Sequence, residues 1–132
     1  MAAKLQRVAP VLLVRDLRAS IAFWRDRVGF ETPSAHEEYP NFAMPTRDGV
    51  TVMLFQTPVG KEPPLPNWRI APATNQMYLW VDDAAALYDE LQARGAPIDF
   101  TLYDTPWGTR EFGIQDPDEN DVAFGQVLVR GI

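Results

Sequence analysis

Residues 8–29 read VAPVLLVRDLRASIAFWRDRVG and contain the clearest structural pattern in the chain. Its first part, VAPVLLV, is short, apolar and rich in β-branched residues, which predicts a strand. From Leu17 to Val28, apolar side chains recur at spacings of four and three, which predicts a helix. Asp16 is placed to cap the start of this helix, and Gly29 is placed to end it.

The same order of elements returns in the second half of the chain. Residues 77–81 (MYLWV) predict a strand, and residues 84–94 predict a helix that ends at a glycine. A single offset aligns three landmarks of the two halves: Asp16 with Asp82, Ile21 with Leu87, and Gly29 with Gly95. Further strands are expected at 41–46 and 51–56 in the first half, and at 98–102, 110–115 and 122–128 in the second. Such a repeat indicates two β-α-β-β-β units.

Each unit is too small to bury its own apolar face, so we expect the two to pair into a single domain over residues 1–132. We place the first unit at 8–56, a proline-rich linker at 57–75 and the second unit at 76–128. Strands outnumber helices, which predicts an α+β fold. In this fold the strands form a curved mixed sheet cup, and the helices cover its convex face. The concave face is then either a second core or a cleft.

Charge and cysteine content exclude several classes of protein. The chain has 12 basic and 18 acidic side chains and a net charge of −6, without the clustered positive charge that nucleic-acid binding needs. Negative charge raises the local concentration of cationic partners, although solubility alone also explains it. There is no cysteine, so disulfides, zinc-thiolate sites and cysteine nucleophiles are excluded. No apolar run is long enough to span a bilayer and there is no signal-peptide core, so we expect a cytoplasmic protein without membrane contact.

Parts of both halves are similar to a known family. The similar stretches are APVLLVRD at 9–16, IAFWRDRVGF at 21–30 and PWGTREFGIQDPDEN at 106–120. They resemble the vicinal oxygen chelate superfamily, which includes glyoxalase I, extradiol dioxygenases and bleomycin resistance proteins, and they resemble the bleomycin resistance group most. The resemblance extends over residues 8–126. Two departures are Glu119, where glycine is usual, and Thr109, which is an extra residue after the Trp-Gly pair.

The resemblance carries an expectation about assembly. It implies a homodimer with a ligand cleft at each end of the subunit interface. It also implies that the N-terminal strand is exchanged between subunits, with Pro10 at the hinge. A proline in an edge strand needs no such explanation, so strand exchange stays open.

The resemblance also bears on metal binding. Superfamily enzymes hold a divalent metal at positions that match Ala9, Met53, Gln76 and Ala123 in this chain. None of these four residues carries a carboxylate or an imidazole, whereas a transition-metal site usually needs three or four such ligands. We therefore expect neither a metal nor another cofactor.

Signatures of catalysis are missing from the sequence. The only histidine, His36, lies in a polar loop beside Glu37 and Glu38, and one histidine cannot build a chelate. There is no Gly-x-Ser-x-Gly elbow, His-Glu-x-x-His motif or phosphate loop. We therefore predict no catalytic residues. One alternative stays open: a metal-dependent lyase, isomerase or dioxygenase whose shifted site uses His36, Glu37, Glu111 or Asp121.

Strand alternation assigns the apolar residues to the two faces of the expected sheet. If the four positions that match metal ligands face the cup, the same face receives Val11, Leu13, Phe55, Tyr78, Trp80 and Gly125. The opposite face packs under the helices and is uniformly apolar: Leu12, Val14, Val52, Leu54, Met77, Leu79, Val81, Val122 and Phe124. The cup therefore collects aromatic and small side chains.

We predict that the cup holds a ligand between aromatic rings. The resemblance places Tyr78 and Trp107 where resistance proteins set tryptophans against the flat heteroaromatic part of the drug, and Phe42 where a phenylalanine lines the same groove. The full predicted ligand-binding set is Phe42, Met53, Phe55, Tyr78, Trp80, Trp107 and Gly108. Core packing is the alternative for Trp80. In the linker, Trp68 either pins the chain down or forms a lid.

Together these features favour a small, non-catalytic protein that sequesters a planar, cationic, drug-like molecule. Resistance to a bleomycin-type antibiotic is the function that the resemblance implies. A sensor module whose cleft binds a metabolite is a third alternative, because fold does not imply function.

Overall fold

A computed structural model describes residues 2–129, and the side chains of Ala35 and His36 lie outside the described part. The first half of the chain contains β1 (Val11–Val14), α1 (Leu17–Val28), a short 3-10 helix η1 (Ser34–Glu38), β2 (Phe42–Ala43), β3 (Thr46–Arg47), β4 (Val50–Thr51) and β5 (Met53–Gln56). The linker contains α2 (Asn67–Ile70). The second half contains β6 (Met77–Trp80), α3 (Ala84–Ala93), β7 (Ile98–Asp104), β8 (Thr109–Gln115) and β9 (Asp121–Val127).

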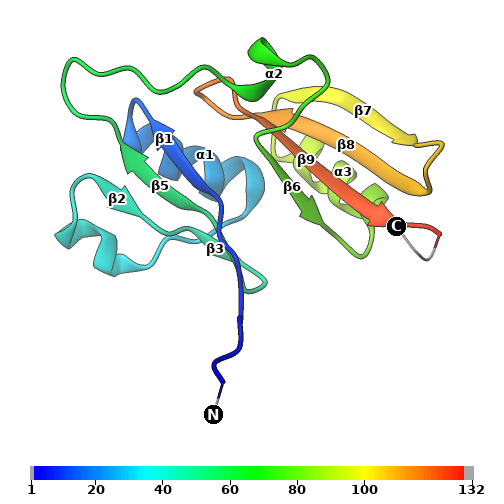
Figure 1. Ribbon diagram of the computed structural model, residues 1–132, viewed down its shortest axis with the longest axis horizontal. Helices are drawn as coiled ribbons and strands as arrows, with labels where there is room; N and C mark the ends of the chain where they lie inside the picture. The colour runs from blue at the N-terminus through cyan, green and yellow to red at the C-terminus, as the bar shows by residue number, and fades with distance from the viewer. Residues whose placement is uncertain (1, 130–132) are drawn as a thin grey trace.

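Both halves follow the same plan. In the first sheet the order is β1-β5-β2, and in the second it is β6-β9-β8-β7; β3 and β4 pair separately as a hairpin. In each half the first strand runs parallel to the last, which requires the crossover that the helix supplies. The two curved sheets lie side by side, with α1 behind the first and α3 behind the second (Figure 1). This arrangement confirms the predicted α+β class.

The strands of the first half are shorter than predicted. The segment expected at 41–46 is divided into β2 and β3 at Pro45, which has no N–H to give to a ladder. The carbonyl of Pro45 still accepts a hydrogen bond from Val52 N–H at 3.0 Å, so the two chain segments stay adjacent. At the tip of the β3–β4 hairpin, Asp48 and Gly49 have φ of 51° and 77°. Two successive left-handed residues are typical of the tight turn that this dipeptide predicts.

Both main helices begin at an aspartate. Asp16 Oδ1 accepts a hydrogen bond from Ala19 N–H at 3.1 Å, as predicted. In the second half Asp83 does the same with Ala86 N–H at 3.0 Å, one residue after Asp82, which the repeat aligned with Asp16. The helix cap of the second half is therefore shifted by one residue from the position that the predicted alignment of the two halves gives.

The hydrophobic core lies between the sheets and the helices. Trp24 of α1 is fully buried. The residues predicted to face the helices are buried, namely Leu12, Val14, Val52, Leu54, Met77, Val122 and Phe124, while Leu79 and Val81 are partly buried and pack against the same cluster. The predicted division of the strand faces is confirmed for this set.

The linker is held against the second half of the molecule. Trp68 Nε1 donates a hydrogen bond to the carbonyl oxygen of Glu119 at 2.7 Å. Near the other end of the linker, Arg15 forms ion pairs with Glu62 at 2.8 Å and with Asp118 at 3.0 Å. Trp68 therefore holds the linker against the turn between β8 and β9.

Among residues 2–129 no helix is long and apolar enough to cross a membrane.

Candidate ligand-binding site

The open face of the second sheet, opposite α3, carries a group of aromatic side chains. Tyr78 and Trp80 come from β6, and their ring centroids are 4.7 Å apart at an angle of 61°. Phe100 and Tyr103 come from β7, with centroids 6.0 Å apart. Trp80 is 57% exposed, so the alternative that it packs in the core is wrong. Tyr103 is also 45% exposed, so part of this aromatic surface faces solvent.

Glycines beneath two of these rings let them lie against the sheet. A Cβ atom at Gly113 would approach the Phe100 ring to 2.3 Å, and one at Gly125 would approach the Tyr78 hydroxyl oxygen to 1.7 Å. Both distances are far shorter than any contact between non-bonded atoms. Tyr78 therefore crosses the strand β9 and reaches β8.

A carboxylate lies at the end of the Tyr78 side chain. The Tyr78 hydroxyl donates a hydrogen bond to Glu111 Oε2, and Thr109 Oγ1 donates a second one to the same oxygen at 3.1 Å. Thr105 Oγ1 lies 2.8 Å from Thr109 Oγ1 and extends the chain of hydroxyl groups. Burial, followed by the hydrogen bond to Glu111 and its negative charge, raises the pKa of Tyr78, which stays a donor at neutral pH.

Sequence reasoning named Glu111 only as a metal ligand of the alternative enzyme. Strand alternation could have placed Glu111 correctly, because Glu111 pairs with Gly125 across β8 and β9 and so shares the face of Tyr78.

Two further carboxylates, Asp99 and Asp121, interact near the other end of this sheet, and burial together with Asp121 raises the pKa of Asp99. The second sheet thus combines aromatic rings with negative charge.

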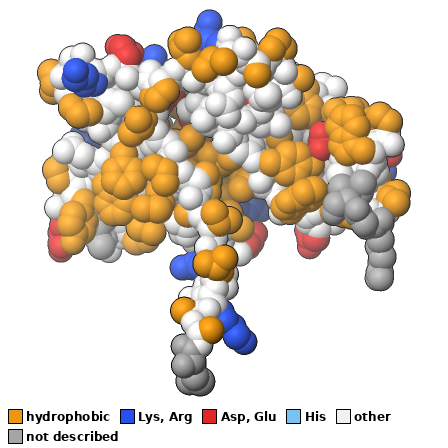
Figure 2. All heavy atoms as spheres, in the orientation of Figure 1, with side chains coloured by type: hydrophobic (Ala, Val, Ile, Leu, Met, Phe, Trp, Pro, Cys, Tyr) orange, Lys and Arg blue, Asp and Glu red, His pale blue; other side chains and the backbone are white. Residues whose placement is uncertain are grey.

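The first sheet carries a second apolar group. The rings of Phe42 and Phe55 are 4.9 Å apart, and Tyr39 packs edge-on against Phe42 at 6.2 Å. Val11 and Leu13 on β1 alternate with buried neighbours and are 58% and 42% exposed. Figure 2 shows hydrophobic side chains gathered over both sheets on this side of the molecule.

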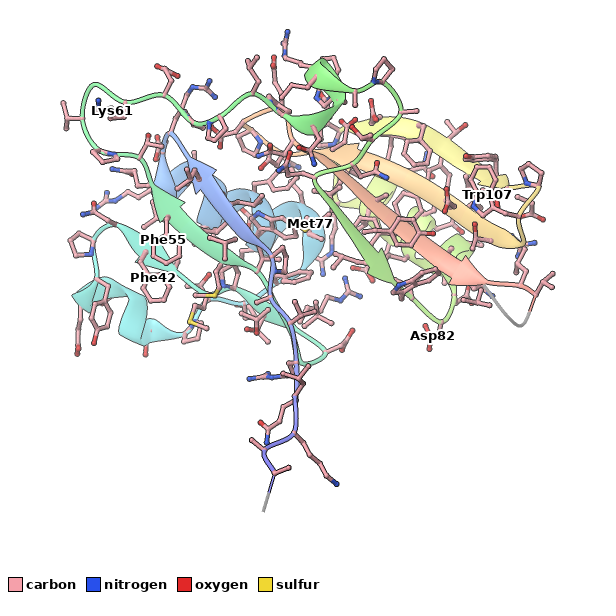
Figure 3. All side chains as sticks on the ribbon, in the orientation of Figure 1. Phe42, Phe55, Lys61, Met77, Asp82 and Trp107 are labelled. Carbon is pink, nitrogen blue, oxygen red and sulfur yellow. The ribbon has the colours of Figure 1, made fainter. Side chains whose placement is uncertain are left out.

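The seven predicted ligand-binding residues therefore form two groups. Phe42, Met53 and Phe55 belong to the first sheet. Tyr78 and Trp80 belong to the second sheet, and Trp107 and Gly108 lie in its turn between β7 and β8. Figure 3 shows Phe42 and Phe55 at one end of the molecule and Trp107 at the other. Trp107 is 56% exposed in the turn between β7 and β8. The carbonyl of Gly108 accepts a hydrogen bond from Leu128 N–H at 2.8 Å, which holds this turn to the end of β9.

A groove that the sequence did not predict lies on the helix side, between the two halves. It has a volume of about 460 Å³. Its walls come from the end of α1, the β3–β4 hairpin, the end of β6 and the start of α3. Across it, Arg47 Nη1 and Nη2 donate hydrogen bonds to the two carboxylate oxygens of Glu90, each at 2.8 Å. This ion pair ties the two halves together.

The positions that superfamily enzymes use for a metal do not fit one here. Of Ala9, Met53, Gln76 and Ala123, only Gln76 has a side-chain oxygen, and that oxygen accepts a hydrogen bond from Asn67 N–H at 3.1 Å. Within the described part of the chain, no three His, Cys, Asp or Glu side chains are grouped as metal ligands would be.

The residues of the alternative metal site do not converge either. Asp121 pairs with Gln115, four residues beyond Glu111 on β8, which separates the two carboxylates by roughly 13 Å along the strand. Glu37 lies in η1 of the first half. The side chain of His36 is outside the described part.

A comparison of the sequence with models of protein families identifies the superfamily of this chain. The chain matches the model of the Glyoxalase/Bleomycin resistance protein/Dioxygenase superfamily over residues 4–124. It therefore belongs to this superfamily. No curated protein sequence matches the chain.

Solved structures agree with this assignment. The chain is similar to a bleomycin-binding protein from bleomycin-producing Streptomyces verticillus, solved with copper(II)-bleomycin, at 27% identity and a TM-score of 0.68, over 93% of this chain and 97% of that one. It is similar to TioX from Micromonospora sp. ML1 at 22% identity and a TM-score of 0.69, over 93% and 99%. It is also similar to a lactoylglutathione lyase from Agrobacterium tumefaciens at 20% identity and a TM-score of 0.65, over 98% and 99%. The last two show the fold alone.

Proposed function

We propose that this protein binds and sequesters a planar, cationic, drug-like molecule of the bleomycin type, without a metal and without chemistry. The observation that carries the proposal is the open face of the second sheet, where the Tyr78 ring packs against Trp80 and its hydroxyl donates to a nearly buried carboxylate, Glu111. The similarity to a bleomycin-binding protein at 27% identity supports the same conclusion.

Three effects are expected to favour binding. Each aromatic stack adds about 0.5–1.5 kcal/mol beyond the burial of apolar surface. A desolvated cation over a ring adds about 1–2 kcal/mol more. The net charge of −6 further raises the local concentration of cationic ligands. A ligand with a flat ring system and a positive charge uses all three effects.

We also propose that the protein works as a homodimer and that the whole chain forms one domain. Each cleft would combine Phe42, Met53 and Phe55 of one copy with Tyr78, Trp80, Trp107 and Gly108 of the other, because Phe42 and Phe55 lie at the opposite end of the chain's own fold from Trp107 (Figure 3). Before β1 the chain runs away from the body of the molecule, with Leu5 and Val8 almost fully exposed (Figure 1). An apolar arm of this kind supports strand exchange. The absence of cysteine fits action in a reducing cytoplasm.

The test of binding is tryptophan fluorescence of the metal-stripped protein during titration with bleomycin. We expect saturable quenching at about one ligand per subunit, and a loss of affinity of about tenfold in Trp107→Ala, since one aromatic stack with its burial is worth roughly 1.4 kcal/mol. Trp68→Phe is the control, because Trp68 points to Glu119 in the linker contact. No saturable binding across a panel of flat cationic drugs would refute sequestration.

Two further measurements separate the alternatives. Binding or turnover that appears only after addition of Zn²⁺, Ni²⁺ or Mn²⁺ would place the protein among the enzymes of the superfamily.

Sedimentation equilibrium tests the dimer. If the N-terminal segment before β1 is exchanged between subunits, removal of residues 1–8 should weaken the dimer. A monomer at the concentrations used for binding would contradict the shared cleft.

A further inference from the structure

Glu111 is a nearly buried carboxylate with hydrogen bonds to only one of its two oxygens. It is 8% exposed at the centre of the second sheet, paired with Gly125 of β9 on one side and with Tyr103 of β7 on the other. Oε2 accepts the hydrogen bonds from Tyr78 and Thr109. Among the described residues, none donates a hydrogen bond to Oε1. The buried polar side-chain atoms without a hydrogen-bond partner are Ser20 Oγ, Trp24 Nε1 and Thr32 Oγ1. Oε1 is not among them, so this oxygen is not fully enclosed. One oxygen is therefore left to a ligand.

The charge of Glu111 also has no partner within the described chain. The arginine next to it in sequence, Arg110, is paired with Asp104 at 2.7 Å and belongs to the other face of β8. Burying a carboxylate without a counter-charge is costly, and two hydroxyl donors offset that cost only in part. An unpaired buried charge beside aromatic rings is the arrangement that a cationic ligand completes.

The chemistry of the carboxylate limits the kind of cation. An ionised carboxylate only accepts hydrogen bonds, so its complement must donate them. A protonated amine, an amidinium or a guanidinium has N–H donors, whereas a quaternary ammonium has the same charge and none. Hydrogen bonds to charged groups are worth about 1.5–3 kcal/mol, which is about tenfold or more in affinity.

We infer that Glu111 determines the specificity of this face by accepting a hydrogen bond at Oε1 from an N–H-bearing cation of the ligand. The Tyr78 hydroxyl and Thr109 hold the carboxylate in place, and the rings of Tyr78 and Trp80 pack against the flat part of the same molecule. This inference rests on the proposed function, and it adds the class of cation that the site selects.

The experiment compares two probes by calorimetry: 1-naphthylmethylammonium and its N,N,N-trimethyl counterpart, which share the ring and the charge and differ in N–H donors. We expect wild type to prefer the first by about tenfold or more. In Glu111→Gln, which keeps the shape of the side chain, this preference should fall to about threefold or less, because a neutral amide oxygen accepts a weaker hydrogen bond. Asp104→Asn is the matched control, since it removes one exposed negative charge from the same sheet. It should keep the preference.

A second variant guards against a folding defect in Glu111→Gln. Tyr78→Phe removes one of the donors to Oε2 and leaves the carboxylate, so the preference should be retained or increased. Retention of the preference in Glu111→Gln, or its absence in wild type, would overturn the role of Glu111. If wild type bound neither probe nor bleomycin, the proposed function itself would fail. Binding of bleomycin with an unchanged preference in Glu111→Gln would refute this inference alone.

Discussion

Gly125 and Tyr78 are matched in shape, because a Cβ atom at position 125 would lie 1.7 Å from the Tyr78 hydroxyl oxygen. The missing side chain on β9 lets the Tyr78 ring cross that strand and donate to Glu111 on β8. The polar centre of the candidate site thus depends on a residue that makes no hydrogen bond to it.

Gly125→Ala should displace Tyr78 from Glu111. Overpacking of this kind costs about 1–3 kcal/mol, and we expect the lower end because the ring lies on an open face. Urea denaturation measures the loss, and the alkaline titration of tyrosine absorbance should show a lower pKa for Tyr78. Gly49→Ala is the control: position 49 has no neighbour within 4 Å and only the left-handed φ of 77° is strained. An unchanged Tyr78 titration in Gly125→Ala would contradict the contact.

Glu111→Gln should lower the pKa of Tyr78. Burial is the largest cause of the raised pKa and remains, but the hydrogen bond to the carboxylate and its charge are weakened. Alkaline titration of tyrosine absorbance in Glu111→Gln checks this prediction.

The stability of the protein should also depend on the ionisation of Tyr78. Its folded-state pKa lies above the ordinary value of 10.0. The contribution of Tyr78 to stability is therefore complete below pH 10.0 and is lost as the pH rises through the folded-state pKa. Wild type should therefore lose stability at alkaline pH more steeply than Tyr78→Phe, as measured by urea denaturation at several pH values. Equal slopes would show that Tyr78 is not perturbed.

Arg47→Ala should loosen the connection between the two halves. Arg47 bonds both oxygens of Glu90 and also donates to the carbonyl of Val28 at 2.9 Å. The side chains are partly exposed, so we expect a loss of about 1 kcal/mol in the free energy of unfolding. Arg110→Ala is the control, because Arg110 pairs with Asp104 inside one exposed hairpin and should have no measurable effect.

The effect of Arg47→Ala should also depend on pH. The hydrogen bond from Arg47 is the largest cause that holds the pKa of Glu90 below its ordinary value of 4.5. A lowered pKa contributes stability that is present above the ordinary value and is lost as the pH falls through the folded-state pKa. The difference between wild type and Arg47→Ala should therefore shrink in acid. A difference that stays constant in acid would mean that the ion pair is not its source.

Glu119→Gly should stabilise the protein. Glu119 adopts a φ of 65°, which glycine accommodates and a β-carbon does not. Relief of this strain is worth about 1 kcal/mol, while the exposed ion pair with Arg69 that is lost contributes less. Glu119→Ala loses the ion pair but keeps the β-carbon, so it should be less stable than wild type. Thermal or urea denaturation of the two variants checks both signs, and a destabilised Glu119→Gly would show that the ion pair dominates.

Structural features that depend on residues close together in the sequence were predictable from the sequence. The helix of the first half begins at Asp16 and ends at Gly29 as expected, and the strands of the second half start within one residue of their predicted positions. Capping and periodicity depend on neighbouring residues, so they can be read along the chain. The exceptions are the strands expected at 41–46 and 51–56, each of which is divided in two. The cap at Asp83 lies one residue after the position that the repeat aligned with Asp16. Of the aromatic residues predicted to bind a ligand, Trp80 and Trp107 are exposed, and their role in binding stays a prediction. Their separation from Phe42 and Phe55 was not predicted.

From the sequence alone came the order of the main strands and helices, the buried faces of β1, β5, β6 and β9, and the family resemblance that the match over residues 4–124 confirms. The contacts between distant residues could be found only in the folded protein: Tyr78 with Glu111, Trp68 with Glu119 and Arg47 with Glu90. These contacts depend on the order and register of strands that lie far apart in the chain. A shift of one residue in register would send Glu111 to the opposite face of β8. Periodicity assigns a side chain to a face, but only the pairing of strands assigns it a neighbour.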